Sequence, residues 1–164
     1  MQIKLFNNML LFSLFGIAMS FFGNLYEGIV IGPNMLQDSI HRMQYWQKFF
    51  VATNPAFFYV PVTQLAAIIS VVLYFKTDKQ KVALKKKLKL AAIFQIASIA
   101  LSVYIITQIN LKLFFGDLEK YRDAVSYMAL LWNVLNAVRI LLVGIALTFT
   151  FRAYVIAQNE RPGA

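Results

Sequence analysis

Long apolar stretches with few charges dominate the hydropathy pattern of the chain, and four of them are long enough to cross a bilayer. A helix needs about 20 mainly apolar residues to span the hydrocarbon core. The stretches cover residues 5–31, 54–75, 90–111 and 126–151, and the last one carries a single interior charge, Arg139. We therefore expect an all-α membrane protein, with residues 1–164 forming one domain built as a four-transmembrane-helix bundle.

The segment 34–50, between the first two spans, is too short and too polar to cross. Its apolar residues recur at helical spacing on one side, and its polar residues share the other side. The apolar side holds Leu36, Ile40, Met43, Trp46 and Phe50, and the polar side holds Asp38, His41, Arg42 and Tyr45. This pattern predicts an amphipathic helix that lies on the outer membrane surface and caps the bundle.

Local signals place two of the helix ends. Asn54-Pro55 combines an N-cap residue with proline at the first helical position, so the second span should begin there. Gly32-Pro33 should end the first helix.

The distribution of basic residues predicts the orientation. Residues 76–89 read as a loop with seven lysines and one aspartate, and such loops lie on the cytoplasmic side. Placing both termini on that side gives it ten basic residues against five on the other. The ten are Lys4, the seven loop lysines, Arg152 and Arg161, and the five are Arg42, Lys48, Lys112, Lys120 and Arg122. We expect a bacterial inner-membrane protein with both termini in the cytoplasm.

Composition removes several classes of chemistry. The chain has no cysteine, which excludes disulfides, thiol nucleophiles and thiolate metal sites. It has one histidine and no carboxylate pair within the spans, so we expect no metal or haem cofactor. The net charge of +9 comes largely from the lysines of one short loop, so we expect contacts with membrane lipids and none with nucleic acid.

The polar residues inside the spans are the candidate site, because an intramembrane charge is costly and usually functional. Trp132, Asn136 and Arg139 form one stripe at i, i+4 and i+7 of the fourth span. Glu27 lies near the outer end of the first span. Counting at 1.5 Å per residue puts Arg139 about half a membrane below Glu27, so an ion pair requires staggered or tilted helices.

We expect the polar side chains to converge on a cavity in the outer half of the bundle, covered by the surface helix that carries His41. The converging set is Asn24, Glu27, Gln64, Tyr104, Gln108, Trp132, Asn136 and Arg139, with Asn133 beside it. Gln95, Ser98 and Ser102 form a separate stripe toward the inside. The alternative is that these groups only hydrogen-bond between helices and hold no ligand.

Two passages resemble the anthrone oxygenase-like membrane family. One is the glycine-rich end of the first span, with Gly23, Gly28 and Pro33, and the other is Trp132-Asn133-Val-Leu-Asn136-Ala-Val-Arg139 in the fourth. Fungal members are associated with oxidation of anthrones to anthraquinones by molecular oxygen without an evident cofactor. The resemblance implies a polar site around Trp132, Asn136 and Arg139.

Two classes of function remain open. As a cofactor-independent oxygenase, the chain would bind a small lipophilic aromatic or quinone-like molecule. Arg139 and Asn136 would stabilise a developing oxyanion, and Glu27 or His41 would take the proton. Trp132 and Tyr104 would stack on the ring, and Asn133, Asn24, Gln64 and Gln108 would complete the ligand site. The alternative is a non-catalytic membrane module, such as a small transporter, lipid binder or assembly partner, and the oligomeric state stays open.

Overall fold

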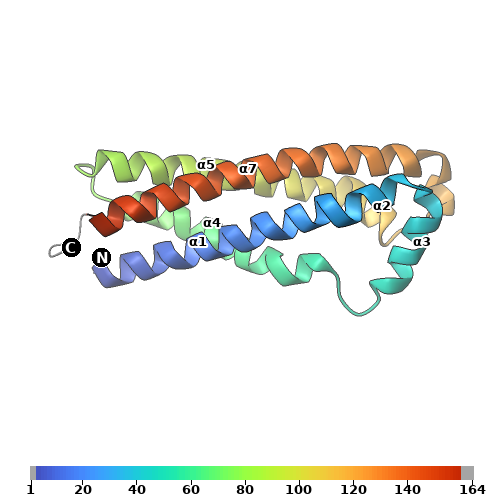
Figure 1. Ribbon diagram of the computed structural model, residues 1–164, viewed down its shortest axis with the longest axis horizontal. Helices are drawn as coiled ribbons and strands as arrows, with labels where there is room; N and C mark the ends of the chain where they lie inside the picture. Colours follow the sequence, from blue (N-terminus) through green and yellow to red (C-terminus); the bar gives the residue numbers. More distant parts are fainter. Residues whose placement is uncertain (1–2, 160–164) are drawn as a thin grey trace.

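The computed structural model describes residues 3–159, and this part of the chain consists of helices and turns without a strand (Figure 1). Four of its helices are long and apolar enough to cross a membrane, which confirms the all-helical character and the predicted number of long apolar helices. The first comprises α1 (Ile3–Tyr26), a π-helical segment η1 (Glu27–Ile31) and α2 (Gly32–Leu36). The second is α4 (Pro55–Lys76). The third comprises α5 (Val82–Ile105), a second π segment η2 (Ile106–Asn110) and α6 (Leu111–Leu113), and the fourth is α7 (Val125–Asn159).

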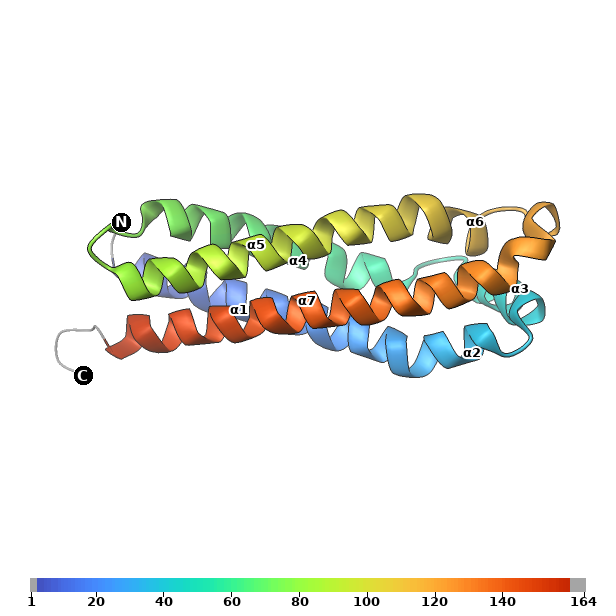
Figure 2. The ribbon, with the colours of Figure 1, turned by 90° about the horizontal axis from the view of Figure 1, so that it is seen from above.

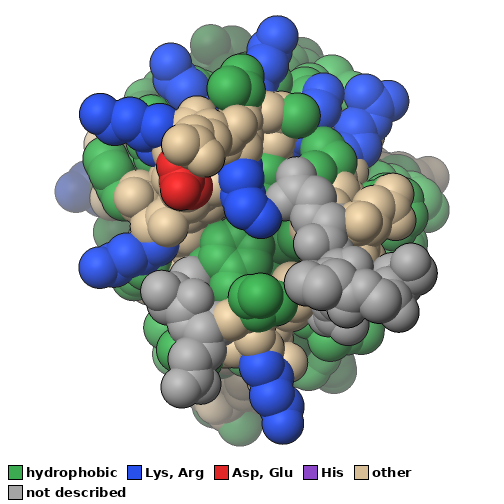
Figure 3. Space-filling model, turned by 90° about the vertical axis from the view of Figure 1, so that its left-hand side faces the viewer, with side chains coloured by type: hydrophobic (Ala, Val, Ile, Leu, Met, Phe, Trp, Pro, Cys, Tyr) green, Lys and Arg blue, Asp and Glu red, His purple; other side chains and the backbone are tan. Residues whose placement is uncertain are grey.

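The long helices form an up-and-down bundle in which the start of α1 and the end of α7 lie at the same end (Figures 1 and 2). The turn between α4 and α5 lies there too, and Lys and Arg side chains surround the rim in the end-on view of Figure 3. We call this the basic end. Arg161, which the sequence also assigns to this side, lies outside the described residues.

The opposite, distal end is covered by α3 (Ser39–Phe49), which runs across the bundle axis (Figure 1). Met43 is fully buried there, and Ile40 and Trp46 pack against the apolar cluster of the distal half. The Gln47 amide donates to the carbonyls of Leu113 and Gly116 at 3.0 and 2.9 Å. Of the predicted helix 34–50, residues 39–49 form α3, which is anchored onto the bundle by its apolar side. Residues 34–36 instead belong to α2, and Leu36 is 47% exposed.

Small residues bring the helices together in the basic half. A Cβ atom on Gly16 of α1 would lie 2.8 Å from the Ala66 Cβ and 3.2 Å from the Val62 carbonyl of α4. Close to this crossing, the hydroxyls of Ser13 and Ser70 are 2.7 Å apart, and the Gln95 amide of α5 donates to Ser70 at 2.9 Å. Helices in lipid gain little from apolar burial, so close packing and such hydrogen bonds are what hold them together.

Two predicted boundaries are wrong. The stretch 76–89 is mostly helical, because α5 already begins at Val82 and leaves only a short turn after Lys76. Lysine is a good helix former, so a membrane helix can continue into water through a lysine-rich sequence. The helix α7 also runs further than predicted, to Asn159, eight residues past the predicted end of the fourth span.

The first helix also fails to end at Gly32-Pro33. The Gly32 N–H bonds to the carbonyl of Glu27, five residues back, and the chain then continues as α2 with Pro33 in its first turn. Proline lacks the N–H that a regular helix needs and clashes with the carbonyl four residues before it. The wider π turn just ahead of Pro33 relieves this conflict, so the helix continues instead of stopping. The predicted start of the second span at Pro55 is confirmed.

Candidate functional site

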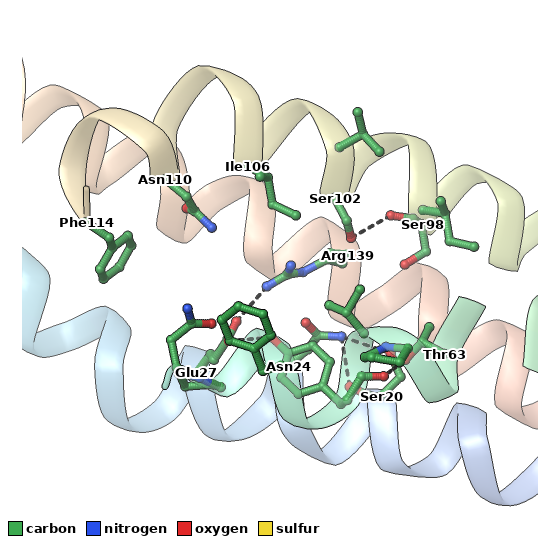
Figure 4. Close-up of a pocket in the computed structure, with 18 of the residues that line it drawn as sticks. Ser20, Asn24, Glu27, Thr63, Ser98, Ser102, Ile106, Asn110, Phe114 and Arg139 are labelled. Atoms are coloured by element: carbon green, nitrogen blue, oxygen red, sulfur yellow. Dashed lines mark hydrogen bonds and ion pairs between the residues drawn. The ribbon is translucent and has the colours of Figure 1, made fainter. Parts of the chain in front are cut away.

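A cavity of about 470 Å³ occupies the distal half of the bundle. Figure 4 shows its walls: Ser20, Asn24 and Glu27 on the first helix, Thr63 on α4, Ser98 and Ser102 on α5, and Arg139 on α7. Ile106 and Asn110 extend the α5 wall, and Phe114 lies toward the distal end. Most of the remaining lining is apolar, so a few polar groups face an otherwise hydrocarbon-like space.

An ion pair between Glu27 and Arg139 crosses one wall of the cavity. The Arg139 Nη2 donates to the Glu27 Oε2 at 2.7 Å, and only 6% and 10% of the two side chains are exposed. The Asn136 Oδ1 accepts from the Arg139 Nη2 at 2.6 Å and from its Nε at 3.1 Å. Asn136 in turn donates to the Asn24 carbonyl at 3.3 Å. The guanidinium is therefore fixed in place by groups from both helices.

Tyr59 of α4 completes the contacts of the carboxylate. Its hydroxyl donates to the Glu27 Oε1, so both oxygens of Glu27 accept hydrogen bonds. This approach depends on Gly23, because a Cβ atom there would lie 2.8 Å from the Tyr59 ring. Three helices thus meet at Glu27.

The length of α7 places Arg139 at the height of Glu27, because the helix extends to Asn159. Arg139 lies 159 − 139 = 20 residues from the basic end of α7, or about 30 Å at 1.5 Å per residue. Glu27 lies 27 − 3 = 24 residues from the start of α1, or about 36 Å. The two Cα positions are therefore at similar heights, and the long arginine side chain covers the difference. The depth gap expected from the sequence came from ending the fourth span at residue 151.

Both π segments contribute to the cavity wall. Glu27 is the first residue of η1, and Ile106 and Asn110 are the ends of η2. A π turn is a widened helical turn that is uncommon and occurs often at functional sites. The two segments lie on facing helices, so the regular helical geometry is interrupted on both sides of the cavity.

Three polar atoms at this site have no hydrogen-bond partner within the described part of the chain. They are the Trp132 Nε1, the Asn24 Oδ1 and the Asn110 Oδ1, and all three residues line the cavity. Trp132 and Asn24 are each 2% exposed. A buried polar atom without a partner costs about 1–3 kcal/mol. Neighbouring atoms enclose each of the three, so a ligand in the cavity reaches them only when the wall adjusts. The Gln95 Oε1 and the Gln158 Nε2, which do not line the cavity, also lack partners among the described residues.

The structure brings together five of the predicted site residues on the cavity wall: Asn24, Glu27, Gln64, Trp132 and Arg139. Asn136 lies behind the wall, where it is fully buried and holds Arg139.

Four predicted residues lie elsewhere. Tyr104 is 49% exposed on the outside of α5, and Gln108 is exposed beside Thr107. Asn133 donates to the Gly32 carbonyl at 3.2 Å and so ties α7 to α2. His41 is exposed on α3, 2.8 Å from Asp38, and is not part of the cavity lining.

The sequence reasoning missed Tyr59 and Asn110, and it placed Ser98 and Ser102 on the stripe directed away from the site. The third span carries polar residues on two faces, so its pattern does not say which face points inward. A polar side chain facing lipid can hydrogen-bond to its own helix, as Thr107 does to the Val103 carbonyl at 2.8 Å. Tyr59 sits among the aromatic residues 57–59, a pattern also typical of a membrane interface.

The fold and the cavity define a bundle of four membrane-type helices with a polar site inside an apolar interior. Within residues 3–159, no group of three or more His, Asp or Glu side chains is arranged to hold a metal ion. Comparisons of the chain with protein-family models, with curated proteins and with solved structures give no match. The function is therefore argued from the cavity itself.

Proposed function

We propose that this protein binds a small lipophilic molecule with a polar group, of aromatic or quinone-like type, in the cavity of the distal half. The observation that carries the proposal is the set of unpartnered polar atoms on a wall that is otherwise mainly apolar. Ligand sites of this kind combine an apolar lining with a few polar groups that fix orientation. Side chains that only join helices can instead satisfy one another, as the hydroxyls of Ser13 and Ser70 do.

The aromatic preference rests on Trp132, whose indole faces the cavity and can both stack on a ring and donate from Nε1. Arg139 adds further donor capacity. Its Nε and Nη2 are engaged, whereas Nη1 makes no hydrogen bond to any of the described residues. A carbonyl oxygen placed between these two side chains would satisfy both.

The proposed function is ligand binding. Oxidation of the bound ligand by molecular oxygen is a separate step, which is measured on its own. Such an oxidation needs a base that takes a proton from the substrate. Glu27 is the carboxylate on the wall, and both of its oxygens already accept hydrogen bonds, from Tyr59 and from Arg139. A proton transfer to Glu27 would require one of these bonds to open.

We infer further that the basic end faces the cytoplasm and that the cavity lies in the outer leaflet of a bacterial inner membrane. The excess of lysine and arginine at the basic end supports this orientation (Figure 3). In this arrangement α3 lies along the outer surface, and the lysines of the basic end contact anionic lipid head groups.

Binding is tested with menadione, a compact quinone, and the fluorescence of Trp132. A Trp46→Phe background leaves Trp132 as the single tryptophan. Saturable quenching by menadione is expected in this background. Ser102→Phe, which fills the cavity from α5, should abolish the saturable part, whereas Thr107→Phe on the outer face of the same helix should preserve it.

Linear, unsaturable quenching that is the same in all three proteins would contradict the proposal. The same preparations, incubated in air with anthrone, report oxidation through the formation of anthraquinone.

A further inference from the structure

A second hollow lies beside the cavity, between α4 and α5. This cleft has a volume of about 410 Å³ and is lined by Gln64, Ala67, Ile68, Val71, Val72, Ile96 and Ile99. Gln64 and Ile99 line the cavity as well, so the two spaces adjoin. Apart from Gln64 the lining is aliphatic. From Gln64 to Val72 the cleft follows α4 toward the basic end for eight residues, or about 12 Å.

The cleft opens on the outside of the bundle, where lipid would lie. Ile68 and Ile96, one on each of its sides, are 59% and 54% exposed. The α4–α5 packing is also the least extensive among the neighbouring long helices. A chain-like apolar group can therefore reach the cavity sideways from the hydrocarbon, without crossing water.

The charges on the cavity wall indicate what kind of polar group fits there. The Glu27 carboxylate already neutralises the Arg139 guanidinium at 2.7 Å. An anionic ligand would bring an unpaired charge into a space shielded from water, which is unfavourable. A neutral group adds no such cost.

The unpartnered atoms of the cavity residues indicate which hydrogen bonds the polar group of the ligand should make. The Trp132 Nε1 can only donate, whereas the Asn24 and Asn110 Oδ1 atoms can only accept. A ligand that satisfies both kinds must itself accept and donate. A phenol-type hydroxyl does both.

We propose that the ligand is a neutral amphiphile with a single hydrocarbon tail: a phenol- or quinol-type head occupies the cavity and the tail lies in the α4–α5 cleft. This inference rests on the proposed function and narrows it from compact aromatic molecules to tailed ones. Moving the tail from lipid into the cleft contributes little binding free energy, because both surroundings are apolar. The cleft instead accommodates the tail sterically while the head is bound.

The test compares para-decylphenol with para-cresol, which has the same head without the long tail. Ile96→Trp places a bulky side chain in the cleft. Ile93→Trp is the matched control, because Ile93 lies on the same helix, is 48% exposed and does not line the cleft. Binding is measured with labelled probes on protein in lipid nanodiscs by scintillation proximity.

The wild-type protein should bind both phenols. Ile96→Trp should lower the affinity for para-decylphenol about tenfold or more, because the added side chain overpacks the cleft. It should leave the affinity for para-cresol unchanged. Ile93→Trp should change neither. Decanoate, which carries the same kind of tail on an anionic head, should bind about tenfold or more weakly than para-decylphenol.

The outcomes separate the two proposals. If para-cresol and menadione bind but Ile96→Trp affects both phenols equally or not at all, the tail does not use the cleft and only the cavity proposal stands. If decanoate binds as tightly as para-decylphenol, the proposal that the site prefers a neutral head group is wrong. If neither para-cresol nor menadione binds, the proposed function itself is wrong.

Discussion

At the scale of single residues, the central feature is a charge pair that the protein satisfies internally. Arg139 bonds to Glu27 and Asn136, and Glu27 also accepts from Tyr59. From the sequence alone, an arginine within an apolar span suggests that an anionic or electron-rich ligand binds to its guanidinium group. The geometry assigns that role to Glu27, so the ligand is left to interact with the remaining donors and acceptors of the wall.

Breaking this pair from either side should destabilise the protein strongly. Glu27→Gln and Arg139→Gln each leave a buried charge alone, and each should lower the free energy of unfolding by about 3–5 kcal/mol. The double variant removes both charges, so it should cost less than the sum of the two single variants by about 1–3 kcal/mol. Titration with SDS in a mild detergent measures these differences.

A second arginine–glutamate ion pair, between neighbouring residues of one short helix, provides the control for exposure. Arg122 and Glu119 are 3.0 Å apart, but both side chains are largely exposed. Glu119→Gln and Arg122→Gln, alone and together, should change stability little, because exposed pairs contribute little. An additive double variant at Glu27 and Arg139 would show that the two residues do not interact in the membrane protein.

At the scale of helices, the sequence predicted the number of long helices and the start of α4, because length, hydropathy and the Asn54-Pro55 signal are local properties. It also identified Arg139, Asn136 and Trp132, because polar residues stand out against an apolar span. It did not predict the π segments, because the hydropathy pattern does not distinguish a π turn from an α turn. It also could not show which face of α5 points into the bundle, because both faces carry polar residues.

Close helix packing gives a prediction at this scale. Gly16→Ala should destabilise the protein by about 1–3 kcal/mol, because the added methyl group would meet the Ala66 Cβ and the Val62 carbonyl, which belong to a rigid helix. Gly144→Ala is the matched control. Its nearest neighbour would be the Phe21 ring at 3.2 Å, which can adjust, and alanine favours the helix more than glycine does.

The midpoint of thermal unfolding in detergent separates the two variants. It should fall for Gly16→Ala and stay level or rise for Gly144→Ala. Equal effects of the two substitutions would mean that α1 and α4 are not in close contact at Gly16.

At the scale of the whole molecule, the arrangement consists of a basic end (Figure 3), an apolar middle and a distal half with the cavity (Figure 4). Because the natural chain has no cysteine, single cysteines can report which end faces which compartment. Lys79 lies exposed in the turn after α4, and Arg42 lies exposed on α3 at the distal end.

In intact cells, a membrane-impermeant maleimide should label Arg42→Cys and should not label Lys79→Cys. Permeabilised cells should give labelling at both positions, which serves as the control for reactivity. Labelling of Lys79→Cys in intact cells would reverse the proposed orientation and place the cavity in the cytoplasmic leaflet.

The two widened turns have a consequence for how this chain aligns with any relative. A π turn holds one residue more than the α turn it replaces, so η1 and η2 are where single-residue gaps are to be expected in an alignment. A relative without the extra residue near Glu27 would have every later side chain of that helix rotated by about a quarter turn around its axis. Pro33 would then come too early to follow a widened turn, and the Gly32 carbonyl would turn away from Asn133 of α7. A gap at this position would therefore mark a protein that has the bundle without this contact between α2 and α7.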